Sequence, residues 1–260
     1  YPGNLLLSFY RNIMDEALIK KICKENEVDI VPQIPRQLGK AMCVPFGDML
    51  NRHIIPNTVT KTMHTEKIFE SDMRNYEIGP FAYYLDLDIQ VKMIKSFQRP
   101  VILVDDVLSK GYRIKAIDPL LKNENVNVQK IIVGIMSARG KEIMDLQNRE
   151  VDCAYFVPNL RLWFNENQLY PFVGGNAVWR GAKPQRNLIP SVNLILPYMS
   201  PAYMRDASKN AIYNLSKVCI ENALDLFTII EHEYENIYER NLTLSSLGRV
   251  FIAPRCPEAG

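Results

Sequence analysis

The sequence is poor in the residues from which metal centres and covalent frameworks are built. Its 260 residues include three histidines, and its five cysteines are scattered, odd in number and never in a Cys-x-x-Cys pair. Three histidines cannot build a histidine-rich metal site, and the cysteine pattern supports neither a disulfide framework nor a zinc site. Free, mostly buried thiols in a reduced cytoplasm are the favoured interpretation.

Long apolar runs and an excess of charge are also absent. No apolar run is long enough to span a bilayer, and the N-terminus shows no signal-peptide pattern, so we expect a cytoplasmic protein without a membrane partner. The net charge of +2 implies no nucleic-acid partner. The chain does not begin with Met and ends at Gly260, so we expect a segment of a longer protein or a trimmed chain.

The common nucleotide and hydrolase motifs are missing as well. There is no Gly-x-Gly-x-x-Gly and no Gly-x-Ser-x-Gly. Gly140-Lys141 resembles the end of a phosphate-binding loop, but Glu142 stands where a hydroxyl residue is needed, and Gly134 is one residue too far away. These absences argue against a dinucleotide-binding fingerprint, an ATPase-type phosphate loop and a serine hydrolase.

Strand and helix patterns alternate through the first part of the chain. The sequence predicts strands at 28–34, 58–62, 101–104, 128–136 and 151–157, and helices at 4–24, 40–51, 88–97, 114–122 and 142–147. This alternation predicts an α/β fold with a mainly parallel sheet flanked by helices. Residues 63–84 have no clean period, which predicts a long mobile loop or a short hairpin.

The last hundred residues follow another pattern. Residues 158–200 are rich in Pro, Gly, Asn and aromatic residues, and we expect an irregular aromatic hood there. From 201 to about 240 the helical period returns, and that helix could cover the sheet or form a dimer interface. We expect residues 1–157 to form the α/β core with its N-terminal helix, and residues 158–260 to pack on the same domain.

The most informative stretch is residues 101–113, where an apolar strand ends in two carboxylates. Asp105 and Asp106 follow the apolar run, and a short loop with a hydroxyl, an amine and a glycine comes next. Ligands of open α/β sheets bind beyond the carboxyl ends of the strands. Two carboxylates at such an end can accept hydrogen bonds from a ribose diol or hold Mg²⁺, and a helix N-terminus suits a phosphate. A structural helix cap is the alternative.

This stretch resembles the phosphoribosyl-pyrophosphate (PRPP) motif of type I phosphoribosyltransferases. The resemblance implies that Asp105 and Asp106 bind the ribose hydroxyls and hold Mg²⁺, directly or through water. It also implies that the loop wraps the 5′-phosphate, with the residues Ser109, Lys110, Gly111, Tyr112 and Arg113. The family usually has small residues where Lys110 and Tyr112 stand, and Thr or Ser where Arg113 stands; a longer cation can still contact phosphate.

The resemblance extends to a second loop and to an activity. In the family, the loop after the first core strand contacts pyrophosphate; residues 35–39 occupy that place, with Arg36 as the catalytic contact and Gly39 beside it. The implied reaction moves a 5-phosphoribosyl group from PRPP to a nitrogenous, nucleobase-like acceptor and releases pyrophosphate, with Mg²⁺ as cofactor. This is chemistry of the glycosyltransferase class.

Two alternatives stay open at this point. The first is a non-catalytic module that senses PRPP or a nucleotide, as the unusual residues in the loop after the acids suggest. The second is an interaction domain of a larger protein, with the C-terminal helix as a docking surface and a homodimer as one form of it.

Overall fold

The structure is a computed structural model that describes residues 7–35, 37–47, 49–50, 53–70, 75–81, 84–163 and 207–243. The chain divides into two compact units, Tyr1–Lys67 with Glu77–Arg161, and Ile68–Tyr76 with Leu162–Gly260. Each is described by itself. The predicted boundary at 157/158 and the packing of 158–260 on the same domain stay predictions.

The first unit is built on a five-stranded parallel sheet. Its elements are α1 (Arg11–Glu25), β1 (Met42–Pro45), β2 (Val59–Thr60), α2 (Leu87–Ser96), β5 (Val101–Leu108), α3 (Tyr112–Asn123), β6 (Val128–Met136), α4 (Ala138–Leu146) and β7 (Val151–Phe156). The strand order is β2-β1-β5-β6-β7, and every described pairing in this sheet is parallel. The predicted fold class, a mainly parallel sheet flanked by helices, is confirmed.

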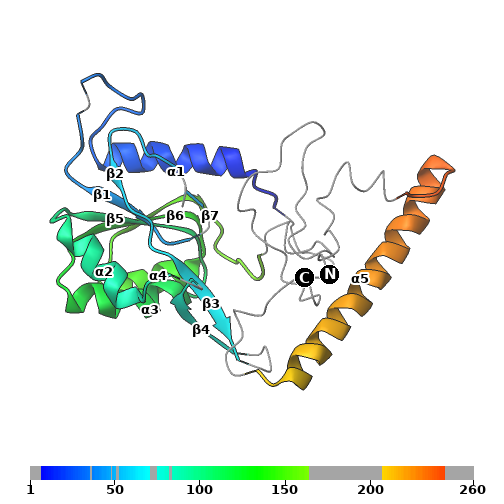
Figure 1. Cartoon of the computed structure of the whole chain (residues 1–260). Coiled ribbons are helices and arrows are strands. Elements are labelled where there is room, and N and C mark those ends of the chain that lie inside the picture. Colours follow the sequence, from blue (N-terminus) through cyan, green and yellow to red (C-terminus); the bar gives the residue numbers. More distant parts are fainter. Residues whose placement is uncertain are drawn as a thin grey trace. The chain divides into compact units, whose positions relative to one another are not determined.

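Helices cover both faces of this sheet, and the alternation of side chains along β5 explains how (Figure 1). Leu103 packs in a core with apolar residues of α2, α3 and α4, whereas Ile102 and Val104 pack on the other face with those of α1. Successive residues of a strand point to opposite faces, so a run that is apolar at every position serves two cores at once. The four-residue run at 101–104 is therefore a strand buried on both sides.

Two predicted elements near the N-terminus are wrong. Residues 28–34 form no strand, and Met42–Pro45, which lies inside the predicted helix 40–51, is β1. β1 is a strand because it pairs with β2 on one side and with β5 on the other. The segment 28–34 has no such neighbour, and the side chain of Asn57 donates hydrogen bonds to two of its carbonyls instead.

Other predictions are confirmed with shifted ends. The helices predicted at 4–24, 88–97, 114–122 and 142–147 correspond to α1, α2, α3 and α4, and the strands predicted at 58–62, 101–104, 128–136 and 151–157 correspond to β2, β5, β6 and β7. The first helix begins seven residues later than predicted, at Arg11, and β5 continues through both acids to Leu108.

Residues 63–84 contain a short hairpin, the second of the two structures predicted for them. Its strands are β3 (Thr65–Phe69) and β4 (Tyr76–Pro80). At its base, the Gln90 side chain of α2 accepts from the His64 N–H at 2.8 Å, and the Thr65 hydroxyl donates to the Phe46 carbonyl at 2.8 Å. The base of the hairpin is therefore attached to α2 and to the end of β1.

The long helix of the second unit is α5 (Lys209–Tyr238), which confirms the helix predicted from 201 to about 240. It begins at Ser208, whose hydroxyl accepts from the Ala211 N–H at 3.2 Å. Among the described residues, no helix is both long enough and apolar enough to cross a membrane. The aromatic hood predicted at 158–200 falls outside the described residues, apart from its first six positions.

Candidate functional site

The candidate site lies where the strand order of the sheet reverses. From β1 the chain moves outward to β2, then returns to the other side of β1 for β5 and continues outward through β6 and β7. The crevice of a doubly wound sheet opens at such a switch point, beyond the carboxyl ends of the two strands. Here those strands are β1 and β5, and β5 carries Asp105 and Asp106 near its end.

Asp105 points toward α3, where it forms an ion pair. Its Oδ1 lies 2.5 Å from Arg113 Nη1 and also accepts the Asp106 N–H at 2.9 Å. The side chains of Asp105 and Arg113 are only 7% and 18% exposed. A buried carboxylate requires such compensation, because removing it from water without a partner is costly. Arg113, predicted as a phosphate contact, is thus the cation that neutralises the first acid.

Asp106 is tied to the loop that follows β1. Pro45 pairs with Val104, so the next residues of β1 come level with the two acids. The N–H of Met49 donates to Asp106 Oδ1 at 2.7 Å. A Cβ added at Gly47 would overlap Asp105 Oδ1 and would lie 2.6 Å from Asp106 Oδ1. Only glycine lets this backbone pass so close to both carboxylates.

The loop between β5 and α3 is a short turn that covers residues 109–111. Gly111 has φ 65°, in the left-handed region that favours glycine, and α3 begins at Tyr112. The Ser137 hydroxyl donates to the Ser109 carbonyl at 3.0 Å and the Ser137 N–H to the Leu108 carbonyl at 3.0 Å, so the loop is anchored to the end of β6.

The side chains and dipole of this loop suit an anion. Lys110 is exposed and Tyr112 is 51% exposed. The N-terminus of α3 carries the positive end of the helix dipole. The loop therefore offers an anchored backbone, an exposed cation and a favourable dipole at one place.

The structure does not bring the other predicted loop to the acids. Gly39 precedes β1, so it lies at the amino edge of the sheet, where a Cβ would overlap the amide of Asn26. Its assignment rested on the strand predicted at 28–34, which does not form. Arg36 lies outside the described residues. The loop that does follow the first core strand begins at Phe46.

Sequence reasoning missed two groups that contact the acids, Gly47 and the Met49 N–H, and also Thr65, which contacts the Phe46 carbonyl. The available signal was the apolar run 42–46 that ends in Gly47, which has the same form as the run that ends in Asp105. Because residues 40–51 were predicted as a helix, the run 42–46 was not interpreted as a strand.

Asp15 on α1 is a further titratable group near the site. Its neighbour Met14 packs against Gly134 of β6, where an added Cβ would lie 3.0 Å from Met14 Sδ and 2.7 Å from the Asp106 carbonyl. Burial raises the pKa of Asp15, although His53 and Arg11 act in the opposite direction. His53 Nε2 lies 3.6 Å from Asp15 Oδ2. Met14, the residue before Asp15, therefore lies close to the backbone of Asp106.

The described residues contain no group of three or more His, Cys, Asp or Glu side chains that could hold a metal ion. Asp105 and Asp106 are carboxylates of the kind that Mg²⁺ accepts, but each has an oxygen bound to a donor of the protein itself. Magnesium at this edge would need oxygen ligands from water or from a bound ligand as well. Asp105 and Asp106 as magnesium ligands stay a prediction.

No family model matches the chain, and no curated protein matches it. Among solved structures, a purine phosphoribosyltransferase from Pyrococcus horikoshii is 14% identical, with a TM-score of 0.33 over 59% of this chain and 84% of its own. A hypoxanthine phosphoribosyltransferase from Staphylococcus aureus is 14% identical, with a TM-score of 0.34 over 60% of this chain and 78% of its own.

A hypoxanthine phosphoribosyltransferase from Trypanosoma cruzi, in complex with its product IMP, is 10% identical, with a TM-score of 0.33 over 64% of this chain and 86% of its own. The chain is thus similar to phosphoribosyltransferases, the family that residues 101–113 resemble.

Proposed function

We propose that the chain binds PRPP at the carboxyl edge between β1 and β5 and transfers its 5-phosphoribosyl group to a nitrogenous, nucleobase-like acceptor, with release of pyrophosphate. The observation that carries the proposal is the position of Asp105 and Asp106. They stand at the switch point of the sheet, directly before an anchored loop and the N-terminus of α3. A ribose with a 5′-phosphate needs acceptors for its hydroxyls and donors for its phosphate, next to each other.

Each part of the site has a task in this proposal. Asp105 and Asp106 accept hydrogen bonds from the ribose hydroxyls and position the ring. The backbone of 109–113 and the side chains of Lys110 and Arg113 hold the 5′-phosphate through charge-assisted donors. Arg36, predicted from the sequence as the contact for pyrophosphate, lies outside the described residues and has no assigned task in this site. If Asp105 and Asp106 hold Mg²⁺, directly or through water, the ion would supply charge neutralisation for the leaving group.

Catalysis in this proposal rests on placement and charge. Positive charge develops on the ribose ring beside the two carboxylates, while negative charge develops on pyrophosphate beside cations. No proton needs to pass through the acids. The base of the hairpin β3–β4 is held next to this edge, because the Thr65 hydroxyl donates to the Phe46 carbonyl.

PRPP binding without turnover is the second candidate function, and one observation favours it. The two acids are bonded to Arg113 and to the Met49 N–H, and Gly47 passes close against both. A ribose that binds to Oδ1 of either acid has to displace these contacts. Because ligand binding breaks contacts within the protein, such a site is suited to respond to its ligand by a change of conformation.

Two further parts of the proposal are independent of the acids. We propose a cytoplasmic location, and a homodimer through the C-terminal helix remains a predicted partner. The apolar residues that α5 exposes include Tyr213, Leu224, Ile229 and Ile237. If the chain dimerises through α5, its apparent mass in sedimentation should rise with protein concentration. Replacing Leu224 and Ile229 by serine should abolish this rise.

One experiment separates the two candidate functions. The chain is incubated with PRPP, Mg²⁺ and a panel of bases, and PRPP binding and pyrophosphate release are measured side by side. Release that depends on a base supports the transferase, whereas binding without release supports the second candidate. If neither is seen, and Asp105→Asn with Asp106→Asn changes nothing, the proposal is wrong. Asp118→Asn, a buried acid that lies in α3 away from this edge, is the matched control.

A further inference from the structure

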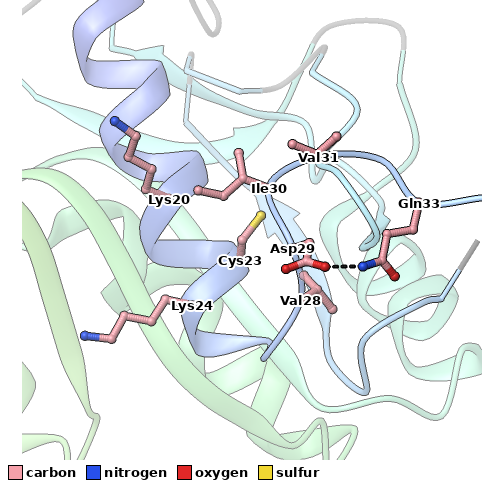
Figure 2. A pocket seen from close by; sticks show the side chains of 8 residues that line it. All are labelled: Lys20, Cys23, Lys24, Val28, Asp29, Ile30, Val31 and Gln33. Atoms are coloured by element: carbon pink, nitrogen blue, oxygen red, sulfur yellow. Dashed lines mark hydrogen bonds between the residues drawn. The ribbon is translucent and has the colours of Figure 1, made fainter.

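A cavity of about 540 Å³ lies between the C-terminal half of α1 and the segment that follows it (Figure 2). It is lined by Lys20, Cys23, Lys24, Val28, Asp29, Ile30, Val31 and Gln33. The segment leads into the amino end of β1, so the cavity belongs to the opposite edge of the sheet from the acid pair. Its size is within the range of about 300–1,000 Å³ that is typical of small-molecule sites.

The wall formed by residues 28–33 is held in place although it has no secondary structure. Asn57, which is 1% exposed, donates from Nδ2 to the Asp29 carbonyl at 2.8 Å and to the Val31 carbonyl at 2.9 Å. Its Oδ1 accepts the Gln33 N–H at 3.3 Å. Three hydrogen bonds from one buried side chain fix the backbone of this wall, so the cavity is a preformed feature of the fold.

The inner surface of the cavity is aliphatic. Ile30 and Val31 are 49% and 71% exposed, although residues of this type are usually buried. Cys23 is 1% exposed and forms the floor, and Figure 2 shows its sulfur between α1 and Ile30. Val28 completes this surface. An aliphatic chain placed here would cover apolar area that now faces water.

Among the described residues, the acidic group of the cavity has a hydrogen-bond partner, whereas its two lysines have no acidic partner. Asp29 accepts a hydrogen bond from the Gln33 side chain across the same wall. Lys21 of α1 pairs with Asp152 at 2.8 Å, but among the described residues Lys20 and Lys24 have no acidic partner. Figure 2 shows their ammonium groups extending outward from the helix, away from Asp29. The cavity thus has an aliphatic floor, and Lys20 and Lys24 contribute to its lining with their ammonium groups turned outward.

We infer that this cavity binds a small aliphatic molecule that ends in an anionic group. The aliphatic chain lies on Val28, Ile30 and Val31 above Cys23, and the anion pairs with Lys20 and Lys24, whose side chains have to turn toward it. Long lysine side chains can cover apolar surface with their methylene groups while the ammonium group stays in water, so both can turn toward such an anion. This site is separate from the proposed PRPP site and does not depend on it.

Octanoate, octylamine and octanol are the probes, and binding to the full chain is measured by calorimetry. Octanoate should bind saturably and more tightly than the other two, and hexanoate should bind about fourfold more weakly for each buried CH₂ it lacks. The variant Lys20→Gln/Lys24→Gln should bind octanoate about tenfold more weakly. The variant Lys92→Gln/Lys115→Gln, with the same change of charge on the other face of the sheet, should bind as the wild type does.

Three outcomes would overturn the inference: no saturable binding of octanoate, equal binding of octylamine, or an equal loss in both double variants. Ile30→Ser gives a second readout, since this exposed residue can be replaced without disturbing the core. It should weaken octanoate and leave folding unchanged by circular dichroism. Unchanged octanoate binding in this variant would also contradict the inference.

Discussion

The ion pair between Arg113 and Asp105 offers the most direct test of the candidate site. The Arg113→Gln variant removes the guanidinium that lies 2.5 Å from Asp105 Oδ1 and leaves a carboxylate that is 7% exposed. Breaking a buried pair on one side costs about 3–5 kcal/mol. Asp105 keeps the Asp106 N–H at 2.9 Å, and Arg113 is itself 18% exposed. We therefore expect a loss of about 2–3 kcal/mol in the free energy of unfolding.

A double-mutant cycle isolates the pair itself. Arg113→Gln, Asp105→Asn and the combined variant are unfolded in urea, and the three free energies of unfolding are compared with the wild type. Removing both charges avoids the stranded carboxylate, so the double variant should be more stable than the sum of the single losses predicts, by about 1–2 kcal/mol. Additive losses, or a loss below about 0.5 kcal/mol for Arg113→Gln, would refute this account of the pair.

The chain contains a matched control for this experiment. Arg149 Nη2 lies 2.6 Å from Asp118 Oδ1, and these side chains are 14% and 4% exposed. Arg149→Gln should therefore cost a similar amount of stability. It should leave PRPP binding unchanged, whereas Arg113→Gln should bind PRPP more weakly, because the guanidinium proposed to meet the 5′-phosphate is gone. Tighter PRPP binding by Arg113→Gln would contradict that role and show that the arginine blocks Asp105.

Three further predictions concern other contacts. Gly47→Ala should lower the free energy of unfolding in urea by about 1–3 kcal/mol and abolish PRPP binding, because the added Cβ would overlap the carboxylates. A neutral effect on both measurements would contradict the close approach of Gly47 to the acids. Asn57→Ala should cost about 2–4 kcal/mol, because it breaks three buried hydrogen bonds and places alanine at φ 50°; octanoate binding should fall with it, and an unchanged midpoint would be inconsistent with this. Burial raises the pKa of Glu25, but hydrogen bonds from Lys130 and Gln129 outweigh it and the pKa lies below its usual value. The stability that Lys130 supplies should thus be complete above about pH 4.3, the unfolded value, and disappear as the pH falls through the lowered pKa, so that wild type and Lys130→Met converge in acid.

Local patterns were sufficient to predict most of the first unit. The apolar run 101–104 predicts a strand buried on both faces, and α3 follows from apolar residues at helical spacing. Helices are predictable because their hydrogen bonds lie within one segment. The position of the acids before a glycine-containing loop was predictable for the same reason, since strand, loop and helix follow each other directly in the chain.

The sequence could not predict what depends on distant partners. Residues 28–34 include four β-branched residues, yet among the described residues they have no neighbouring strand, whereas β2 pairs with β1. A strand exists through hydrogen bonds to another segment. The same reason explains β1, whose four residues were predicted as helix. Their place between β2 and β5 decides their conformation.

The same difference between local and distant contacts applies to the residues of the candidate site. The sequence by itself determined that two acids, a loop and a helix start stand together, because their separation along the chain is short. Only the tertiary structure decided that Arg113 pairs with Asp105, and that Gly47 and the Met49 N–H close on the acids from β1. These contacts depend on the parallel register in which Pro45 pairs with Val104, and a register between segments 59 residues apart is set by the packing of the whole sheet.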